Sequence, residues 1–273
     1  MRLALAQLNY TVGAFDANFA RMREAVERAR AARADLVIFT ELAATGYPPR
    51  DLLSHAGFVD ANLALVDRLA ALTDDALGLL VGYAAPNPSS EGKRLFNAVA
   101  LCHRGRIAGT RMKSLLPTYD VFDEDRYFEP AHEVAPIEFK GRRLGVTICE
   151  DVWNAKAIWP QRLYHRDPVD EVVRAGADLL INLSSSPFSL GKAALRRELV
   201  GEDARKHRRY FFYVNQVGGN DELIFDGHSI AFDPAGRIVL RARDFDEDFL
   251  LYDVPDAEAA GSIAGDVAEV SGG

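Results

Sequence analysis

The chain has 273 residues, of which 48% are hydrophobic and 26% charged, and its formal net charge is -8. This size fits one large globular domain or two small ones. The negative charge and the lack of a lysine or arginine run argue against a nucleic-acid partner, which requires clustered positive charge. No segment holds the roughly 18 consecutive apolar residues that span a bilayer, and the amino terminus lacks a signal-type hydrophobic region. We therefore expect a cytoplasmic protein without a membrane partner.

Strand and helix patterns alternate along the first part of the chain. Short apolar runs predict buried strands, and apolar positions three and four residues apart predict helices. The predicted elements are strands over 3–8, 35–40, 77–83, 96–103 and 106–112, and helices from Asp16 and over 59–72. The last two strands are joined by Arg104-Gly105, which is typical of a β-hairpin.

The second part begins with a stretch over 113–128 that is too irregular for a helix and rich in aromatic residues, as in a functional loop. Strands are predicted over 134–139, 144–149, 178–183, 210–216, 229–233, 238–242 and 249–254, and helices over 169–174 and 190–206. This alternation indicates an α/β architecture with a mixed sheet and helices outside. We expect one domain over 1–255, followed over 256–273 by a linker or truncated tail rich in alanine, glycine and serine.

Three reactive side chains lie at the carboxyl ends of predicted strands: Glu41 and Lys113 each follow directly on a strand, and Cys149 is the last residue of one. The carboxyl ends of strands gather at one edge in layered α/β proteins, and sites form there. Each residue also has a simpler interpretation. Glu41 fits a helix-initiating acid, Lys113 a solvated strand terminus and Cys149 a small buried apolar residue. Their shared position favours a common site.

The three side chains suit hydrolysis of an amide through a covalent thioester. A thiol with a pKa of ~8.5 is mostly protonated at neutral pH, so Cys149 needs a base. We assign Glu41 as that base and as the later proton donor to the leaving ammonia. Lys113 would keep Glu41 ionised and, with the backbone N–H of Glu150, would stabilise the tetrahedral oxyanion. The histidine spacing indicates no metal site.

Three sequence blocks resemble the Glu-Lys-Cys triad of the nitrilase (carbon-nitrogen hydrolase) superfamily. They are Thr-Glu-Leu-Ala-Ala-Thr-Gly-Tyr-Pro-Pro-Arg-Asp-Leu-Leu with Glu41, Lys-Ser-Leu-Leu-Pro-Thr-Tyr from Lys113, and Ile-Cys-Glu-Asp-Val-Trp with Cys149. These blocks and Asn-Leu-Ser-Ser-Ser-Pro-Phe-Ser-Leu-Gly-Lys are similar to the glutaminase domain of glutamine-dependent NAD synthetases. The resemblance covers nearly the whole chain, from Leu3 to about Val254.

The resemblance implies a four-layer αββα sandwich, association into a homo-oligomer, and hydrolysis of L-glutamine to glutamate and ammonia. By motif position, Tyr119, Ser186 and Lys192 match residues that hold glutamine, with Lys192 facing the α-carboxylate. Glu124 matches the auxiliary acid near the triad, and Glu150 assists through its backbone N–H. The alternatives are a plain turn at Ser186 and a core aromatic at Tyr119.

The resemblance also implies a partner, an NAD synthetase domain that uses ATP and magnesium to amidate nicotinic acid adenine dinucleotide. The glutaminase reaction itself is expected to need no cofactor and no metal. We expect the tail over 256–273 to lead to a synthetase domain that this chain lacks. Two alternatives stay open: a free-standing amidase for another small amide, and a non-enzymatic scaffold for oligomerisation or regulation.

Overall fold

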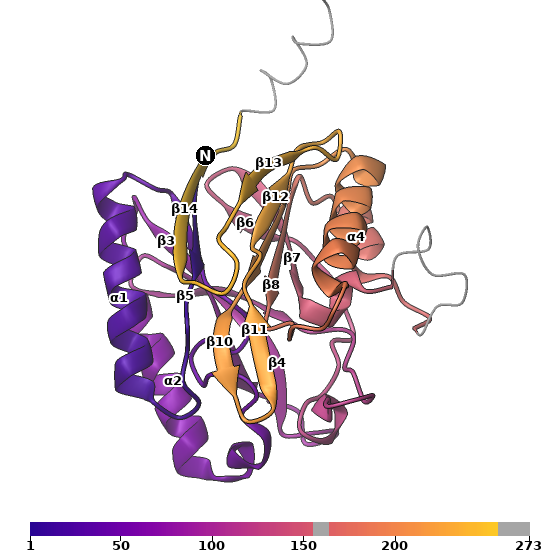
Figure 1. Ribbon diagram of the computed structural model, residues 1–273. Coiled ribbons are helices and arrows are strands. Elements are labelled where there is room, and N and C mark those ends of the chain that lie inside the picture. Colours follow the sequence, from indigo (N-terminus) through magenta and orange to yellow (C-terminus); the bar gives the residue numbers. More distant parts are fainter. Residues whose placement is uncertain (155–163, 256–273) are drawn as a thin grey trace, which may run out of the picture.

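A computed structural model describes residues 1–154 and 164–255, so the predicted tail over 256–273 lies outside the described residues. Two six-stranded sheets lie face to face in the middle of the molecule, and helices cover their outer faces (Figure 1). The layers therefore follow the order helix, sheet, sheet, helix, which confirms the expected four-layer sandwich.

The first sheet has the strand order β14-β1-β2-β3-β4-β5. Its strands are β1 (Arg2–Gln7), β2 (Leu36–Ile38), β3 (Gly78–Pro86), β4 (Leu95–His103), β5 (Arg106–Met112) and β14 (Asp248–Asp253). Strands β1, β2 and β3 are parallel, whereas β14 pairs antiparallel with β1, β4 with β3 and β5 with β4. Helices α1 (Phe15–Ala31) and α2 (Ala56–Ala70) pack on its outer face. Because β5 runs parallel to β2, both strands end at the same edge.

The second sheet has the order β13-β12-β9-β8-β7-β6. Its strands are β6 (Ile137–Phe139), β7 (Arg142–Ile148), β8 (Leu179–Ser184), β9 (Phe211–Asn215), β12 (Ile230–Phe232) and β13 (Ile238–Arg241). Helices α3 (Pro168–Arg174) and α4 (Lys192–His207) cover it. The remaining elements are a small hairpin of β10 (Val217–Asn220) and β11 (Leu223–Asp226), and short 3-10 helices η1 (Arg50–Ser54), η2 (Glu124–Arg126) and η3 (Cys149–Val152).

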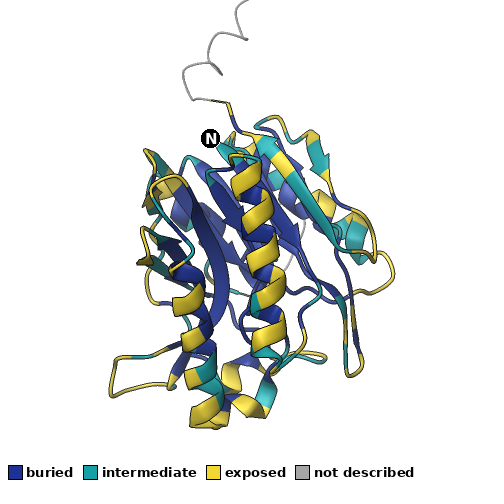
Figure 2. Cartoon of the chain, turned by 90° about the vertical axis from the view of Figure 1, so that its left-hand side faces the viewer, coloured by how far each residue is buried: buried dark blue, intermediate teal, exposed yellow. Residues whose placement is uncertain are grey.

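Alternate residues of the central strands face two different cores. In β1, Leu5 packs between the two sheets against residues such as Ile181, while Ala4 and Ala6 lie under the outer helices. Figure 2 shows the result, with buried strands and helices that expose only their outward faces. In a sheet that is buried on both faces, apolar and polar residues do not alternate along the strands. This explains the continuous apolar runs in the sequence.

Several sequence-based details differ from the structure. The residue pattern alone indicated one mixed sheet, but the described residues form two six-stranded sheets and a separate two-stranded one, because apolar runs do not reveal which strands pair. The hairpin of β10 and β11 was not predicted, since its first strand contains Gly218 and Gly219, which are rare in strands. Cys149 begins η3 instead of ending a strand, and Glu41 follows Ile38, the last residue of β2, by three positions.

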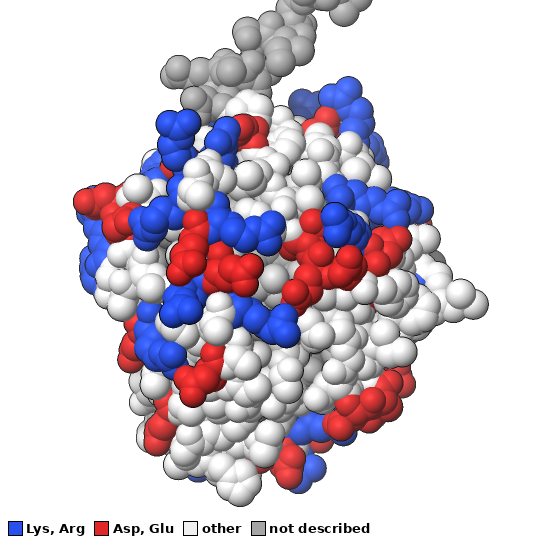
Figure 3. All heavy atoms as spheres, turned by 60° about the vertical axis from the view of Figure 1, so that its left-hand side comes forward, with Lys and Arg blue, Asp and Glu red and all other residues white. Residues whose placement is uncertain are grey.

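On the face of the molecule in Figure 3, basic and acidic side chains are interspersed, without a continuous basic stripe. None of the helices within residues 1–154 and 164–255 has both the length and the apolar character needed to cross a membrane.

Candidate active site

Cys149 lies at a sharp turn between β7 and η3. Its backbone φ is +40°, in the left-handed region that residues with a side chain rarely adopt. Such strain is found at functional sites, where a nucleophile at the end of a strand is held out of the strand direction. Here the turn places the thiol in the wall of a cavity.

The cavity has a volume of about 430 Å³, in the range of small-molecule sites. Its wall comes from the 113–128 loop, η3 and the start of α4. The lining residues are Tyr119, Phe122, Cys149, Glu150, Trp153, Ser186, Ser189, Leu190, Gly191, Lys192 and Leu195. The structure thus brings Cys149, Glu150, Tyr119, Ser186 and Lys192 around one cavity.

Glu41, Lys113 and Glu124 form a buried ion-pair cluster. Lys113 Nζ lies 2.7 Å from Glu41 Oε1 and 2.9 and 2.7 Å from the two carboxylate oxygens of Glu124. The side chains of Lys113 and Glu41 are fully buried. Burial opposes the charge on Lys113, but the carboxylates of Glu124 and Glu41 outweigh it and hold the lysine pKa well above its usual value. The lysine is therefore an ammonium.

The Glu41 carboxylate is held by further donors. Asn97 Nδ2 donates to Oε1 over 2.8 Å, and the backbone N–H of Ser185 donates to Oε2 over 2.9 Å. Oε1 thus accepts from Lys113 and Asn97, whereas Oε2 accepts one bond and retains capacity for a proton. Gly82 allows the Glu41 segment to pack on β3, because a Cβ there would lie 2.3 Å from the backbone nitrogen of Leu42.

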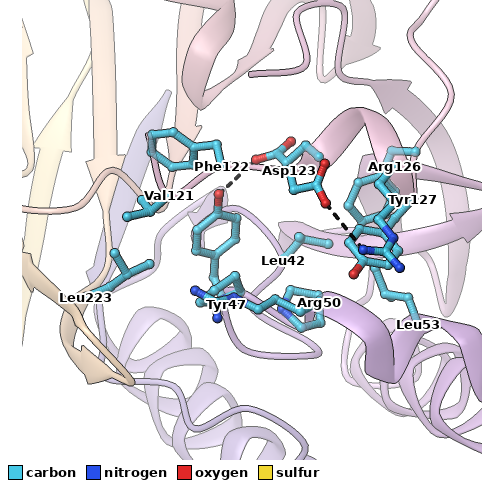
Figure 4. Close-up of a pocket in the computed structure, with 14 residues that line it drawn as sticks. Leu42, Tyr47, Arg50, Leu53, Val121, Phe122, Asp123, Arg126, Tyr127 and Leu223 are labelled. Atoms are coloured by element: carbon cyan, nitrogen blue, oxygen red, sulfur yellow. Dashed lines mark hydrogen bonds and ion pairs between the residues drawn. The ribbon is translucent and has the colours of Figure 1, made fainter. Parts of the chain in front are cut away.

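Glu124 faces a second cavity, of about 310 Å³. The Tyr47 hydroxyl donates a hydrogen bond to Glu124 Oε1 over 2.8 Å, and Figure 4 shows this bond as a dashed line from the Tyr47 hydroxyl. Burial raises the pKa of Glu124; Lys113 opposes this effect and Glu41 adds to it. Phe122 lines both cavities.

Cys149 is 6% exposed. Burial raises the pKa of its thiol, the Glu41 carboxylate raises it further, and Lys113 only partly offsets both. The resting side chain is therefore a thiol instead of a preformed thiolate, and it could act as a nucleophile only if a base took its proton.

Glu150 is fixed by two phenols. Tyr119 donates to its carboxylate oxygens over 2.8 and 3.0 Å, and Tyr164 donates to Oε1 over 2.9 Å. Burial raises the pKa of Glu150, an effect that Lys113 and the two phenol hydrogen bonds oppose. Tyr119 thus orients Glu150 in addition to lining the cavity.

Ser186 and Lys192 each present a polar group that makes no hydrogen bond to another described residue. Ser186 Oγ is buried and makes no hydrogen bond to any described residue. Lys192 begins α4, and its Nζ lies 5.2 Å from the centre of the Trp153 ring. Burial lowers the pKa of Lys192, while Cys149 and Glu150 oppose this change. Both groups are available to a ligand.

Sequence analysis did not identify three contacts of this site, which are made by Tyr47, Asn97 and Tyr164. The hydroxyl of Tyr47 reaches Glu124 across 77 positions in the chain, and Asn97 reaches Glu41 across 56. No local pattern reports such contacts. Within residues 1–154 and 164–255, no group of three histidine, cysteine, aspartate or glutamate side chains is arranged to hold a metal ion.

Comparison with known proteins gives consistent matches over nearly the whole chain. The profile of the carbon-nitrogen hydrolase family matches residues 2–262. The glutamine-dependent NAD(+) synthetase of Synechocystis sp. is 43% identical over 264 residues, which are 95% of this chain and 47% of that protein. The protein of the same name from Thermotoga maritima is 34% identical over 259 residues, which are 93% of this chain and 42% of that protein. The chain therefore spans about half the length of these relatives.

Comparison with solved structures also gives matches over nearly the whole chain. The glutamine-dependent NAD+ synthetase of Acinetobacter baumannii, in complex with ADP, superimposes with a TM-score of 0.81 at 34% identity, over 92% of this chain and 44% of that one. A mutant of the Nesterenkonia AN1 amidase from the nitrilase superfamily superimposes with a TM-score of 0.78 at 22% identity, over 96% of this chain and 93% of that one. At that identity, the second likeness shows the fold alone.

Proposed function

Because this chain belongs to the carbon-nitrogen hydrolase family, we propose that its Cys149 cavity hydrolyses the side-chain amide of L-glutamine to glutamate and ammonia. The proposal of an amino-acid substrate rests on one observation. The cavity presents a carboxylate from Glu150 and an ammonium from Lys192 beside the nucleophile. A zwitterionic amino acid has the two complementary charges, an α-ammonium for Glu150 and an α-carboxylate for Lys192.

The uncharged part of the site supports the same substrate. Ser186 Oγ has no partner among the described residues and is free to bind a polar atom of the ligand. Phe122 and Trp153 supply apolar wall for the methylene groups of the side chain. A simple aliphatic amide has no carboxylate, so it would leave the Lys192 ammonium in the cavity without an opposite charge from the ligand, which costs free energy.

We assign the first chemical step to Cys149 and Glu41. Cys149 Sγ forms a bond to the amide carbon while its proton passes to Glu41, and the C=O electron pair moves to oxygen. The resulting oxyanion is stabilised by Lys113 and the backbone N–H of Glu150; a single such donor is typically worth ~3 kcal/mol. Oε2 of Glu41 is the better acceptor of the proton, since it receives only the Ser185 N–H.

The second half of the reaction uses the same base. Glu41 returns the proton to the amide nitrogen as the C–N bond breaks, so ammonia leaves and a Cys149 thioester remains. Glu41 then takes a proton from water as the water attacks the thioester carbonyl. Cleavage of the C–S bond releases glutamate, and the thiol regains its proton.

The names of the relatives support a role for the ammonia. We propose that it serves the ATP-dependent amidation of nicotinic acid adenine dinucleotide to NAD in a synthetase domain, which would bind the ATP and magnesium. Assembly into a homo-oligomer, cytoplasmic location and the division into a domain over 1–255 and a linker over 256–273 are part of this proposal.

The direct test is to incubate the protein with 6-diazo-5-oxo-L-norleucine, measure the intact mass, and assay ammonia release from glutamine in parallel. Cys149→Ala is the control. We expect one label at Cys149 in the wild type, none in the variant, and ammonia release by the wild type alone. Labelling without turnover would indicate a pocket that needs its synthetase domain for activity. Absence of labelling, together with hydrolysis of a simple amide such as propionamide, would instead establish the amidase alternative.

A further inference from the structure

Asn97 occupies an unusual place for a polar residue. It lies in β4, between β3 and β5, and it is fully buried in a strand whose neighbours Phe96 and Ala98 are apolar. Its backbone carbonyl accepts the N–H of Lys113 over 2.8 Å. The residue is thus fixed at the base of the ion-pair cluster by its main chain.

The side-chain amide of Asn97 contacts both acids of the cluster. Nδ2 donates to Glu41 Oε1 over 2.8 Å and to Glu124 Oε2 over 3.3 Å. An amide nitrogen carries two hydrogens, so one is available for each carboxylate. Because a flipped amide would turn its oxygen toward both acids, the carboxylates also determine the orientation of the side chain.

The same side chain leaves a polar atom unsatisfied. Asn97 Oδ1 is buried and has no hydrogen-bond partner among the described residues. An orphaned buried oxygen destabilises a fold, and an apolar side chain would suit this strand better. The hydrogen bonds from its two N–H donors are therefore the feature that offsets the free-energy cost of burying Asn97 Oδ1 without a partner.

Glu41 and Glu124 share one ammonium, that of Lys113. Two buried carboxylates around a single positive charge repel each other, and the repulsion favours protonation of one of them. We propose that Asn97 is a positioning residue, whose amide bridges Glu41 and Glu124 and keeps Glu41 oriented and ionised as the acceptor of the Cys149 proton. The inference rests on the proposed role of Glu41 as the base, but not on glutamine as the substrate.

The test compares Asn97→Ala with Asn18→Ala. Asn18 is also fully buried, but among the described residues its side chain hydrogen-bonds only to the main chain of Thr11 and to neither acid. The readout is the rate at which chloroacetamide alkylates Cys149 as a function of pH, with Cys149→Ala as the blank. In this reaction Sγ forms the bond to carbon, chloride leaves, and the thiol proton passes to the base.

Loss of the two donors is expected to shift the acid limb of the alkylation rate against pH in Asn97→Ala upward by about one pH unit. This shift corresponds to a tenfold change in the ionisation constant of the base. Glutamine kcat should fall about tenfold or more, while KM stays within about twofold, since Asn97 does not line the Cys149 cavity. Asn18→Ala should lose stability but keep the wild-type profile.

An unchanged profile and kcat in folded Asn97→Ala would overturn the proposal. If that variant does not fold, Asn97→Ser replaces it; a serine hydroxyl can donate to one carboxylate, so a smaller upward shift supports the bridge and no shift refutes it. Wild-type alkylation at Cys149 without glutamine hydrolysis would mean either another amide substrate or a pocket that needs its synthetase domain, and the comparison of alkylation profiles would still decide the role of Asn97.

Discussion

The carboxylate of Asp151 bonds to the backbone N–H of Ser114 over 3.0 Å and thereby joins the end of one sheet to the turn of the other. The same oxygen accepts the N–H of Leu115 over 2.9 Å, and the other oxygen accepts the N–H of Ile148 over 3.0 Å. Ile148 precedes Cys149, and Ser114 follows Lys113. One buried side chain therefore sets the distance between the proposed nucleophile and the lysine of the ion-pair cluster.

Asp151→Asn should impair both stability and turnover. An asparagine offers one acceptor in place of two, and its amide group would face a backbone N–H. We expect the free energy of unfolding to fall by about 2–4 kcal/mol and kcat to fall about tenfold. Denaturant titration and steady-state kinetics measure the two effects. Asp16→Asn, at an exposed ion pair with Arg68, is the control and should change stability by less than about 0.5 kcal/mol.

Lys113→Met keeps the length of the side chain but removes the ammonium. Glu41 and Glu124 would then be buried without a counter-charge, which typically destabilises a protein by about 3–5 kcal/mol. Both acids would take up protons more readily, so the variant should be more stable at pH 5 than at pH 8. We expect kcat to fall by at least about 10³-fold, as ammonia release would show. Turnover within a few-fold of wild type would exclude a catalytic role for Lys113.

Ser186→Ala removes a hydroxyl that has no partner among the described residues. Stability should therefore be unchanged, whereas KM for glutamine should rise about tenfold through the loss of one hydrogen bond to the substrate. Ser184→Ala is the matched control, because Ser184 Oγ donates to Asn182 Oδ1 over 2.7 Å and does not line the cavity. It should lose about 1 kcal/mol of stability and retain the wild-type KM.

Lys192→Met should raise KM for glutamine with a smaller effect on kcat, because the ammonium is proposed to hold the α-carboxylate. The variant should also lose its preference for glutamine over propionamide, which lacks that carboxylate. Steady-state kinetics with both amides test the prediction. A change confined to kcat would contradict an anchoring role.

Asp203, which does not line the Cys149 cavity, provides a test of how the free energy of unfolding depends on pH. Burial raises the pKa of Asp203 to about 8, and the charge of Asp167 contributes. In the unfolded chain the pKa is ~3.9, so the folded protein retains a proton that the unfolded chain releases between these values. The stability contributed by this proton is complete below pH ~4 and is lost as the pH rises through about 8.

Asp203→Asn carries no titrating group, so it should gain stability relative to wild type as the pH is raised. Between pH 5 and pH 8.5, we expect the difference in unfolding free energy to move in favour of the variant by about 1–3 kcal/mol. Thermal or denaturant unfolding at both pH values measures it. A constant difference across this range would show that Asp203 is ionised in the folded protein.

The strands that precede Lys113 and Cys149 could be predicted from the sequence because they depend on local patterns. The run before Cys149 and the hairpin before Lys113 identify two strands by their apolar residues and turn chemistry alone. The hairpin turn at Arg104-Gly105 has positive φ at both residues, as its composition indicates. The similarity of three sequence blocks to a known superfamily supplied the layer order that periodicity could not.

Only the tertiary structure decided how these strand ends meet. Lys113 follows a strand of the first sheet and Cys149 a strand of the second, and their proximity depends on the packing of two sheets that are both apolar on both faces. The bridge from Asn97 to Glu41 and Glu124 joins different strands and loops, so no local period encodes it. Sequence patterns specify which face of an element is buried, whereas the partner of a buried polar group is determined only when all the layers have packed.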